Sequence, residues 1–153
     1  MAILFLDSSG LVKPYIAETG STWVQSVTNS ASGNECYIAQ ITGAEMVSAV
    51  TRCLRRGDLT PADAATALAG FEADFRQNLV LLENPLPRVR DAMTLIRRHG
   101  LRGYDALQLA VALHLRDRGR PFGRPDPLFI TADRELTVAA LAEGLAADDP
   151  NNH

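Results

Sequence analysis

Several features that common function classes require are missing from this 153-residue sequence. Its two cysteines, Cys36 and Cys53, lack CxxC spacing, and its three histidines lack the spacing of metal ligands. A zinc centre and a disulfide scaffold are therefore not expected. Both thiols are predicted to be small buried side chains in a reducing compartment.

Long hydrophobic runs are absent as well. No apolar stretch approaches the roughly 20 residues that a membrane-spanning helix needs. Met1 leads directly into a short apolar run, without the basic segment and cleavage site of a secretory signal. We therefore expect a cytoplasmic protein with no membrane partner.

The common catalytic and phosphate-binding motifs are also absent, namely the P-loop, the GxGxxG fingerprint, the GxSxG nucleophile elbow and the HExxH zinc motif. Lysine occurs once, at Lys13, and the net charge is −3. That charge does not by itself favour a polyanionic partner. Four acidic residues discussed below make the net charge negative. Without them the rest of the chain, which is rich in arginine, has a net charge of +1, and this is compatible with a polyanionic partner.

Short apolar runs alternate with helical segments along the chain. The predicted strands are 3–7, 35–39, 79–82, 128–131 and 145–148, and the predicted helices are 8–18, 20–31, 41–56, 61–77, 87–99, 104–118 and 134–143. This alternation predicts an α/β fold with a mainly parallel central sheet of about four to five short strands, flanked by helices. We expect one domain, 1–149, followed by a frayed tail, 150–153.

Four acidic residues stand at the borders of apolar segments. Asp7 and Asp133 follow two predicted strands, Asp105 opens an apolar helix, and Glu45 interrupts the apolar face of another. Ligand sites of open parallel sheets lie beyond the carboxyl ends of the strands. Asp7, Asp133 and Asp105 are therefore expected to converge at that edge.

Clustered carboxylates without histidine or cysteine suit Mg²⁺, with Mn²⁺ as a second choice. Such ions serve phosphodiester hydrolysis by activating a water molecule and stabilising charge on the phosphate oxygens. Each acid also has a purely structural interpretation. Asp7 and Asp133 could cap helices, with Ser8 or Thr131 sharing that task, and Asp105 suits a helix start. Glu45 could pair with Arg52, two turns further along its helix.

Four segments of the chain together resemble a known family. They are Phe5–Tyr15, Thr42–Glu45, Leu101–Ala110 and Phe129–Leu136. In this order they resemble the PIN domain, and most of all the VapC-type toxins of type II toxin–antitoxin pairs. The resemblance implies a metal-dependent endoribonuclease that is usually a homodimer and is held inactive by a small cognate antitoxin.

By position, the acids Asp7, Glu45, Asp105 and Asp133 match the family's catalytic and metal-binding quartet, and Thr131 matches its supporting hydroxyl. The resemblance also suggests that Gly10 and Gly103 replace residues that more often carry a side chain, which we expect to loosen two loops near the site.

Candidate contacts for macromolecules follow from the same segments. Arg52 could reach an RNA phosphate from the helix of Glu45, and Lys13 is a second candidate for RNA. Tyr15 and Trp23 lie close to Asp7 in the sequence and are candidates for the antitoxin surface. RNA bases stack on aromatic side chains. The candidates for such stacking are Tyr15, Trp23, Tyr37 and Tyr104.

Two other function classes remain open at this point. The first is a PIN-fold module that binds RNA or a partner protein and cleaves too slowly to matter. The second is a metal-dependent phosphatase on a similar sheet, which is disfavoured because a dehalogenase-type nucleophile would need a second aspartate at Ser9.

Overall fold

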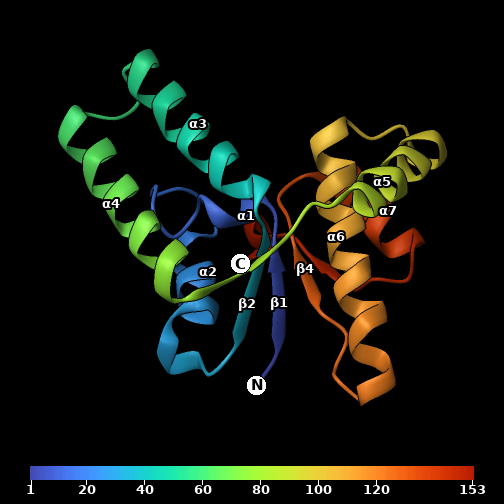
Figure 1. The fold of residues 1–153 in the computed structure, drawn as a ribbon. Coiled ribbons are helices and arrows are strands. Elements are labelled where there is room, and N and C mark those ends of the chain that lie inside the picture. The colour runs from blue at the N-terminus through green and yellow to red at the C-terminus, as the bar shows by residue number, and fades with distance from the viewer.

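A computed structural model describes all 153 residues as seven helices around a five-stranded sheet (Figure 1). The strands are β1 (Ile3–Leu6), β2 (Glu35–Ala39), β3 (Leu79–Leu82), β4 (Leu128–Ile130) and β5 (Ala147–Asp148). The helices are α1 (Ser8–Leu11), α2 (Ser21–Thr28), α3 (Ile41–Arg56), α4 (Pro61–Gln77), α5 (Leu86–His99), α6 (Gly103–Gly119) and α7 (Arg134–Ala142). Three single 3₁₀ turns cover Ser30–Ser32, Arg120–Phe122 and Pro150–Asn152.

The sheet is entirely parallel and has the order β3-β2-β1-β4-β5. The chain builds outward from β1 through β2 to β3 and then crosses to β4 on the other side. β1 and β4 are therefore the neighbours at which the winding reverses. In parallel sheets, the crevice at the carboxyl ends of such a pair is where ligands bind.

Alternating side chains of the strands feed two separate cores. Ile3, Phe5 and Phe129 pack on the side covered by α5, α6 and α7. Leu4, Leu6 and Ile130 pack on the opposite side, where α1 to α4 lie. Both faces of the central strands are buried, as expected for a parallel sheet with helices on each side.

The helix boundaries follow from local chemistry. Thr60 accepts a hydrogen bond from the Asp63 amide and precedes Pro61, the first residue of α4. Gly57 and Gly100 end α3 and α5 in the left-handed conformation that glycine adopts without strain. Figure 1 shows α3 and α4 as a pair that leans away from the sheet, whereas α6 lies against it. None of the helices is both long and apolar enough to span a bilayer.

The predicted fold class is confirmed, and the bounds of α3 and α4 and of β2 and β3 match the predicted ones. The first predicted helix, 8–18, is wrong beyond Leu11, because the chain continues in turns around Pro14, whose ring and missing amide oppose a continued helix. Cys53 is only partly buried, contrary to the prediction.

Residues 150–153, for which the sequence predicts a frayed tail, include a 3₁₀ turn that contacts the rest of the domain. Pro150 is buried, and its carbonyl lies so close to Gly20 that a side chain there would clash. The Asn151 side chain accepts a hydrogen bond from Lys13 Nζ, and the His153 ring stacks on Trp23 with 4.1 Å between ring centroids. These polar and aromatic contacts order a segment that its composition alone marks as flexible.

Gly10 does not loosen a loop as expected but lies in close contact with the end of β4. A Cβ atom at this position would lie 2.7 Å from the Ile130 carbonyl oxygen, because α1 sits directly against the end of β4. A Cβ atom at Gly103 would meet nothing within 4 Å. The close approach at Gly10 brings the residues after β1 and β4 together.

We expect Gly10→Ala to destabilise the protein by about 1–3 kcal/mol, since the backbone of β4 or α1 must shift to admit the methyl group. The matched control Gly103→Ala should stay within about 0.5 kcal/mol of wild type. Urea denaturation of the three proteins measures both effects. Equal stabilities for the two variants would show that the approach of α1 to β4 does not depend on glycine.

Candidate active site

Asp7 is the buried centre of the polar network at the carboxyl end of β1. Its carboxylate accepts hydrogen bonds from the Gly10 amide at 2.8 Å, from Ser9 Oγ at 2.7 Å and from Thr131 Oγ1 at 2.7 Å. The side chain is only 3% exposed. It therefore caps α1, as its structural interpretation predicted, and is also tied to the end of β4.

Burial is the main reason why the carboxyl group of Asp7 is a weaker acid than usual. Desolvation raises the pKa of this carboxyl from 3.8 to about 6, and its hydrogen bonds to Thr131, Gly10 and Ser9 only partly oppose that rise. The charge of Asp105 raises this pKa further. At neutral pH, the chain therefore keeps a buried carboxylate with several donors around it but no cation.

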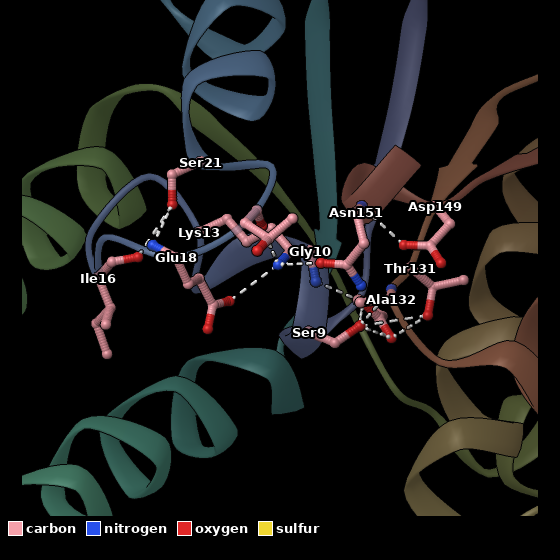
Figure 2. A network of polar contacts seen from close by, with 12 residues as sticks. Ser9, Gly10, Lys13, Ile16, Glu18, Ser21, Thr131, Ala132, Asp149 and Asn151 are labelled. Carbon is pink, nitrogen blue, oxygen red and sulfur yellow. Dashed lines mark hydrogen bonds and ion pairs between the residues drawn. The ribbon is translucent and has the colours of Figure 1, made fainter. Parts of the chain in front are cut away.

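The supporting hydroxyls come from α1 and from the end of β4. Ser9 Oγ and Thr131 Oγ1 lie 3.3 Å apart, and Ser9 also accepts a hydrogen bond from the Ala132 amide (Figure 2). Thr131 takes the supporting position expected for it. Ser8 does not, because on α1 it is Ser9 that lies toward Asp7, while Ser8 lines a neighbouring cavity.

Asp133 follows the same strand and begins α7. Its side chain accepts a hydrogen bond from the Leu136 amide at 3.0 Å, so the predicted capping role is present. Its backbone amide donates to Thr131 Oγ1. Asp133 and Asp7 are thus linked through one threonine at the reversal point of the sheet.

Glu45 is held by two residues that sequence reasoning missed. Gln108 Nε2 donates to Glu45 Oε2 at 2.6 Å and also exchanges hydrogen bonds with the Thr42 hydroxyl. Gln108 and Thr42 are fully buried between α3 and α6. The sequence signal that could have identified them is their spacing from the acids. Thr42 lies three residues before Glu45, and Gln108 lies three residues after Asp105, so each is about one helical turn from an acid.

Asp105 lies at the electrostatic centre of the four acids. Its charge raises the pKa of Asp7 and of Glu45, although desolvation is the larger cause in both residues. The pKa of Asp105 itself is raised by desolvation and then by the charge of Asp133. Asp105 is therefore close enough to each of the other three acids to repel it.

None of these four carboxylates forms a salt bridge with a lysine, arginine or histidine. As they stand, no three acidic, cysteine or histidine side chains come close enough together to ligate one ion. The chemistry of the donors nevertheless fits Mg²⁺ or Mn²⁺, since all are carboxylate oxygens, and the repulsion among them is what a divalent cation would relieve.

Arg52 lines a cavity together with Glu45, Ser8 and Ser9. It does not form the ion pair with Glu45 that one interpretation predicted. Its guanidinium instead donates to Ser48 Oγ at 2.9 Å, and its charge lowers the pKa of Glu45 from a distance. The side chain is exposed and able to meet a further anion.

Lys13 cannot serve as the RNA contact that the sequence suggested. Its side chain is buried, and Nζ donates to Glu18 Oε1, to the Thr19 carbonyl and to Asn151 Oδ1, all within 3.0 Å (Figure 2). The three partners use all its protons. Lys13 is therefore a structural link between the loop after α1 and the C-terminal turn.

Tyr15 and Trp23 are less available than a docking surface requires. The Tyr15 hydroxyl donates to Asp74 at 2.6 Å, and its ring packs edge-on against Phe71. Trp23 is covered on one face by His153. Both aromatic side chains join parts of the same domain and remain half-buried, and their predicted contact with an antitoxin stays a prediction.

The raised pKa of Asp7 makes the free energy of unfolding depend on pH. Between pH 4 and 6 the folded protein holds a proton at Asp7 that the unfolded chain has released, so stability falls as the pH rises through this window. A pKa near 6 in place of 3.8 corresponds to roughly 3 kcal/mol at neutral pH.

We expect the free energy of unfolding of wild type, relative to Asp7→Asn, to fall by up to about 3 kcal/mol between pH 4 and pH 7 in EDTA. Urea denaturation at each pH measures this difference. A difference that stays constant with pH would show that Asp7 is not protonated in this range. Asparagine keeps an oxygen for the Gly10 amide, so the variant should fold.

Comparisons with known proteins agree with this site and fold. No family model matches the chain. Among solved structures, Mycobacterium tuberculosis VapC20, a sarcin-ricin loop cleaving toxin, has a TM-score of 0.59 at 17% identity and covers 90% of this chain and 95% of its own. VapBC2 from Rickettsia felis, solved with a promoter DNA fragment, also has a TM-score of 0.59, at 14% identity, covering 96% and 98%.

Sequence similarity is closer to a curated relative. Ribonuclease VapC45 from Mycobacterium tuberculosis is 30% identical over 144 residues, which cover 94% of this chain and 93% of the relative. The structural neighbours show the same fold, and the matched region spans nearly the whole chain. The chain therefore belongs to the VapC family of PIN-domain ribonucleases.

Proposed function

We propose that this protein is a metal-dependent endoribonuclease and acts as the toxin of a toxin–antitoxin pair. The observation that carries the proposal is the group of four carboxylates near the reversal point of the sheet: Asp105 repels the other three, and none of the four has a salt-bridge partner. Family membership supplies the substrate class, since the curated relatives are named ribonucleases.

Asp7, Glu45, Asp105 and Asp133 are the residues that would hold Mg²⁺ or Mn²⁺. When bound, the metal supplies a water of lowered pKa and stabilises charge that develops on the phosphate. The chain prepares its own groups for this role. Ser9, Thr131 and the Gly10 amide fix Asp7, and Gln108 fixes Glu45. These hydrogen bonds hold Asp7 and Glu45 in place, and a bound cation would draw the four carboxylates closer together.

The electrostatic state of the site favours an incoming cation. With a pKa of about 6, Asp7 is mostly ionised at neutral pH, but its ionised form lies in a poorly solvated place. The charge of Asp105 makes that state less favourable. A cation that offsets this repulsion binds more tightly to the folded chain than to the unfolded one, and so stabilises it.

The proposed partners are RNA as substrate, a small antitoxin protein and a second copy of this chain. The neighbouring structure VapBC2 supports the antitoxin, because it is a toxin–antitoxin complex. Exposed apolar side chains on α7, at Val138 and Leu141, are compatible with a contact between copies. We propose that the reaction takes place in the cytoplasm, where cellular RNA is available.

The two other function classes fit the site less well. A dehalogenase-type phosphatase with Asp7 as its nucleophile would need a second aspartate two residues later, and Ser9 stands there instead and donates a hydrogen bond to Asp7. A module that only binds RNA has no use for a buried carboxylate without a cationic partner, which costs stability.

Asp105→Asn tests the proposal. Expression of wild type should halt bacterial growth, and co-expression of the protein encoded just upstream should restore it. Expression of Asp105→Asn should not affect growth, because the substitution removes the charge at the centre of the acidic group. In vitro, the purified variant should cleave labelled bacterial RNA at least 100-fold more slowly in Mg²⁺. Mg²⁺ should raise the Tm of wild type more than that of the variant.

Asp117→Asn is the matched control, since it makes the same change at the opposite end of α6, where Asp117 meets only Arg116. It should retain both growth arrest and cleavage. Cleavage by Asp105→Asn at the wild-type rate, or harmless expression of a folded wild type without antitoxin, would contradict the proposed function.

A further inference from the structure

Two cavities flank the acidic group and share two of their lining residues. The first, of about 540 Å³, lies between α1 and α3 and contains Arg52. The second, of about 490 Å³, lies between α5 and α6 and contains Arg102 and Asp105. Glu45 and Tyr104 line both cavities. Each is within the size range of small-ligand sites, so both together exceed the needs of a metal ion.

Tyr104 stands where the two cavities meet, and its ring is 59% exposed. The other aromatic candidates for stacking are engaged. Tyr15 donates to Asp74, Tyr37 donates to Glu35, and Trp23 is stacked on His153. Tyr104 makes no side-chain hydrogen bond and stacks on no other ring. It is the open aromatic face beside the acids.

The arginines have a matching arrangement, with one in each cavity. Arg52 lines the first cavity beside Glu45, and Arg102 lines the second cavity beside Asp105 and Glu45. Neither arginine forms a salt bridge, and both are exposed. Each guanidinium is thus near an acid yet free to pair with another anion.

We propose that a single-stranded segment of RNA lies across Tyr104, from one cavity to the other. One unpaired base stacks on the Tyr104 ring, and the phosphates on either side approach Arg52 and Arg102. This places the intervening backbone beside Glu45 and Asp105. The inference rests on the proposed ribonuclease function and adds to it the residue that holds one base, Tyr104, and the path of the strand across the two cavities.

The need for an unpaired strand follows from the geometry of stacking. A base can stack on an exposed protein ring only if it has left its own helix, and paired A-form RNA keeps its bases stacked. Stacking on an aromatic side chain accepts any base. Tyr104 therefore selects unpaired nucleotides, whereas the rest of the two cavities would determine which sequence is preferred.

The test uses a fluorescein-labelled library of random single-stranded RNA 12-mers. Cleavage is measured in Mg²⁺, and binding is measured by fluorescence anisotropy in EDTA. Tyr104→Ala should weaken binding and slow cleavage about tenfold, because one stacked base contributes about a factor of 5 to 150. Tyr104→Phe, which keeps the ring, should stay within twofold of wild type.

Phe122→Ala is the matched control, since Phe122 is also an exposed aromatic residue, 80% accessible, but lies in the 3₁₀ turn after α6 and in neither cavity. It should bind and cleave as wild type does. Arg102→Ala should make the dependence of binding on salt shallower by about one charge. The same library annealed to its complement should be bound and cleaved at least tenfold less well.

The outcomes separate this inference from the proposed function. If wild type cleaves the library and Tyr104→Ala cleaves it equally well, the stacking inference is overturned while the nuclease stands. If Tyr104→Ala cleaves normally but escapes inhibition by the upstream-encoded protein, Tyr104 is a partner contact and the inference is overturned as well. If wild type cleaves no RNA yet binds the library through Tyr104, the strand path is supported and the nuclease proposal fails.

Discussion

The burial of the Asp7 carboxylate next to further acids, without a cationic partner, is the constraint on which the rest of the site depends. Asp7 is buried beside Thr131; desolvation is the main cause that raises its pKa and that of Glu45, and the charge of Asp105 raises both further. An arrangement of this kind opposes folding, and it persists because the two cores on either side of the sheet supply the stability that it removes. Strain of this kind at a site is typical of function rather than of packing.

The only lysine shows how the chain treats a buried charge that has no function of this kind. Lys13 is as buried as Asp7, but it has a carboxylate, a carbonyl and an amide oxygen around it. Asp7 has three donors but no cation. The fold thus surrounds the buried charge of Lys13 with acceptors, one of them a carboxylate, and leaves the buried charge of Asp7 without a cation of its own.

Much of this was accessible from the sequence. Apolar runs followed by acids predicted both the parallel sheet and the edge at which Asp7 and Asp133 meet. Ser9, Gln108 and Thr42 were missed, because their roles depend on how α1, α3 and α6 pack and not on local pattern. Lys13 was misjudged for the same reason: its three partners come from the loop after α1 and from the C-terminal turn, and composition does not reveal contacts across 138 residues.

The central claim is that the four acids form one cation site. Anomalous scattering from crystals soaked in Mn²⁺ tests it most directly, since the peak locates the metal independently of activity. The account predicts a peak at the carboxyl end of β1 with the carboxylates of Asp7 and Asp105 among its ligands, and loss of that peak in Asp105→Asn. A folded, RNA-cleaving protein with no Mn²⁺ peak there, or with its metal elsewhere, would contradict the account.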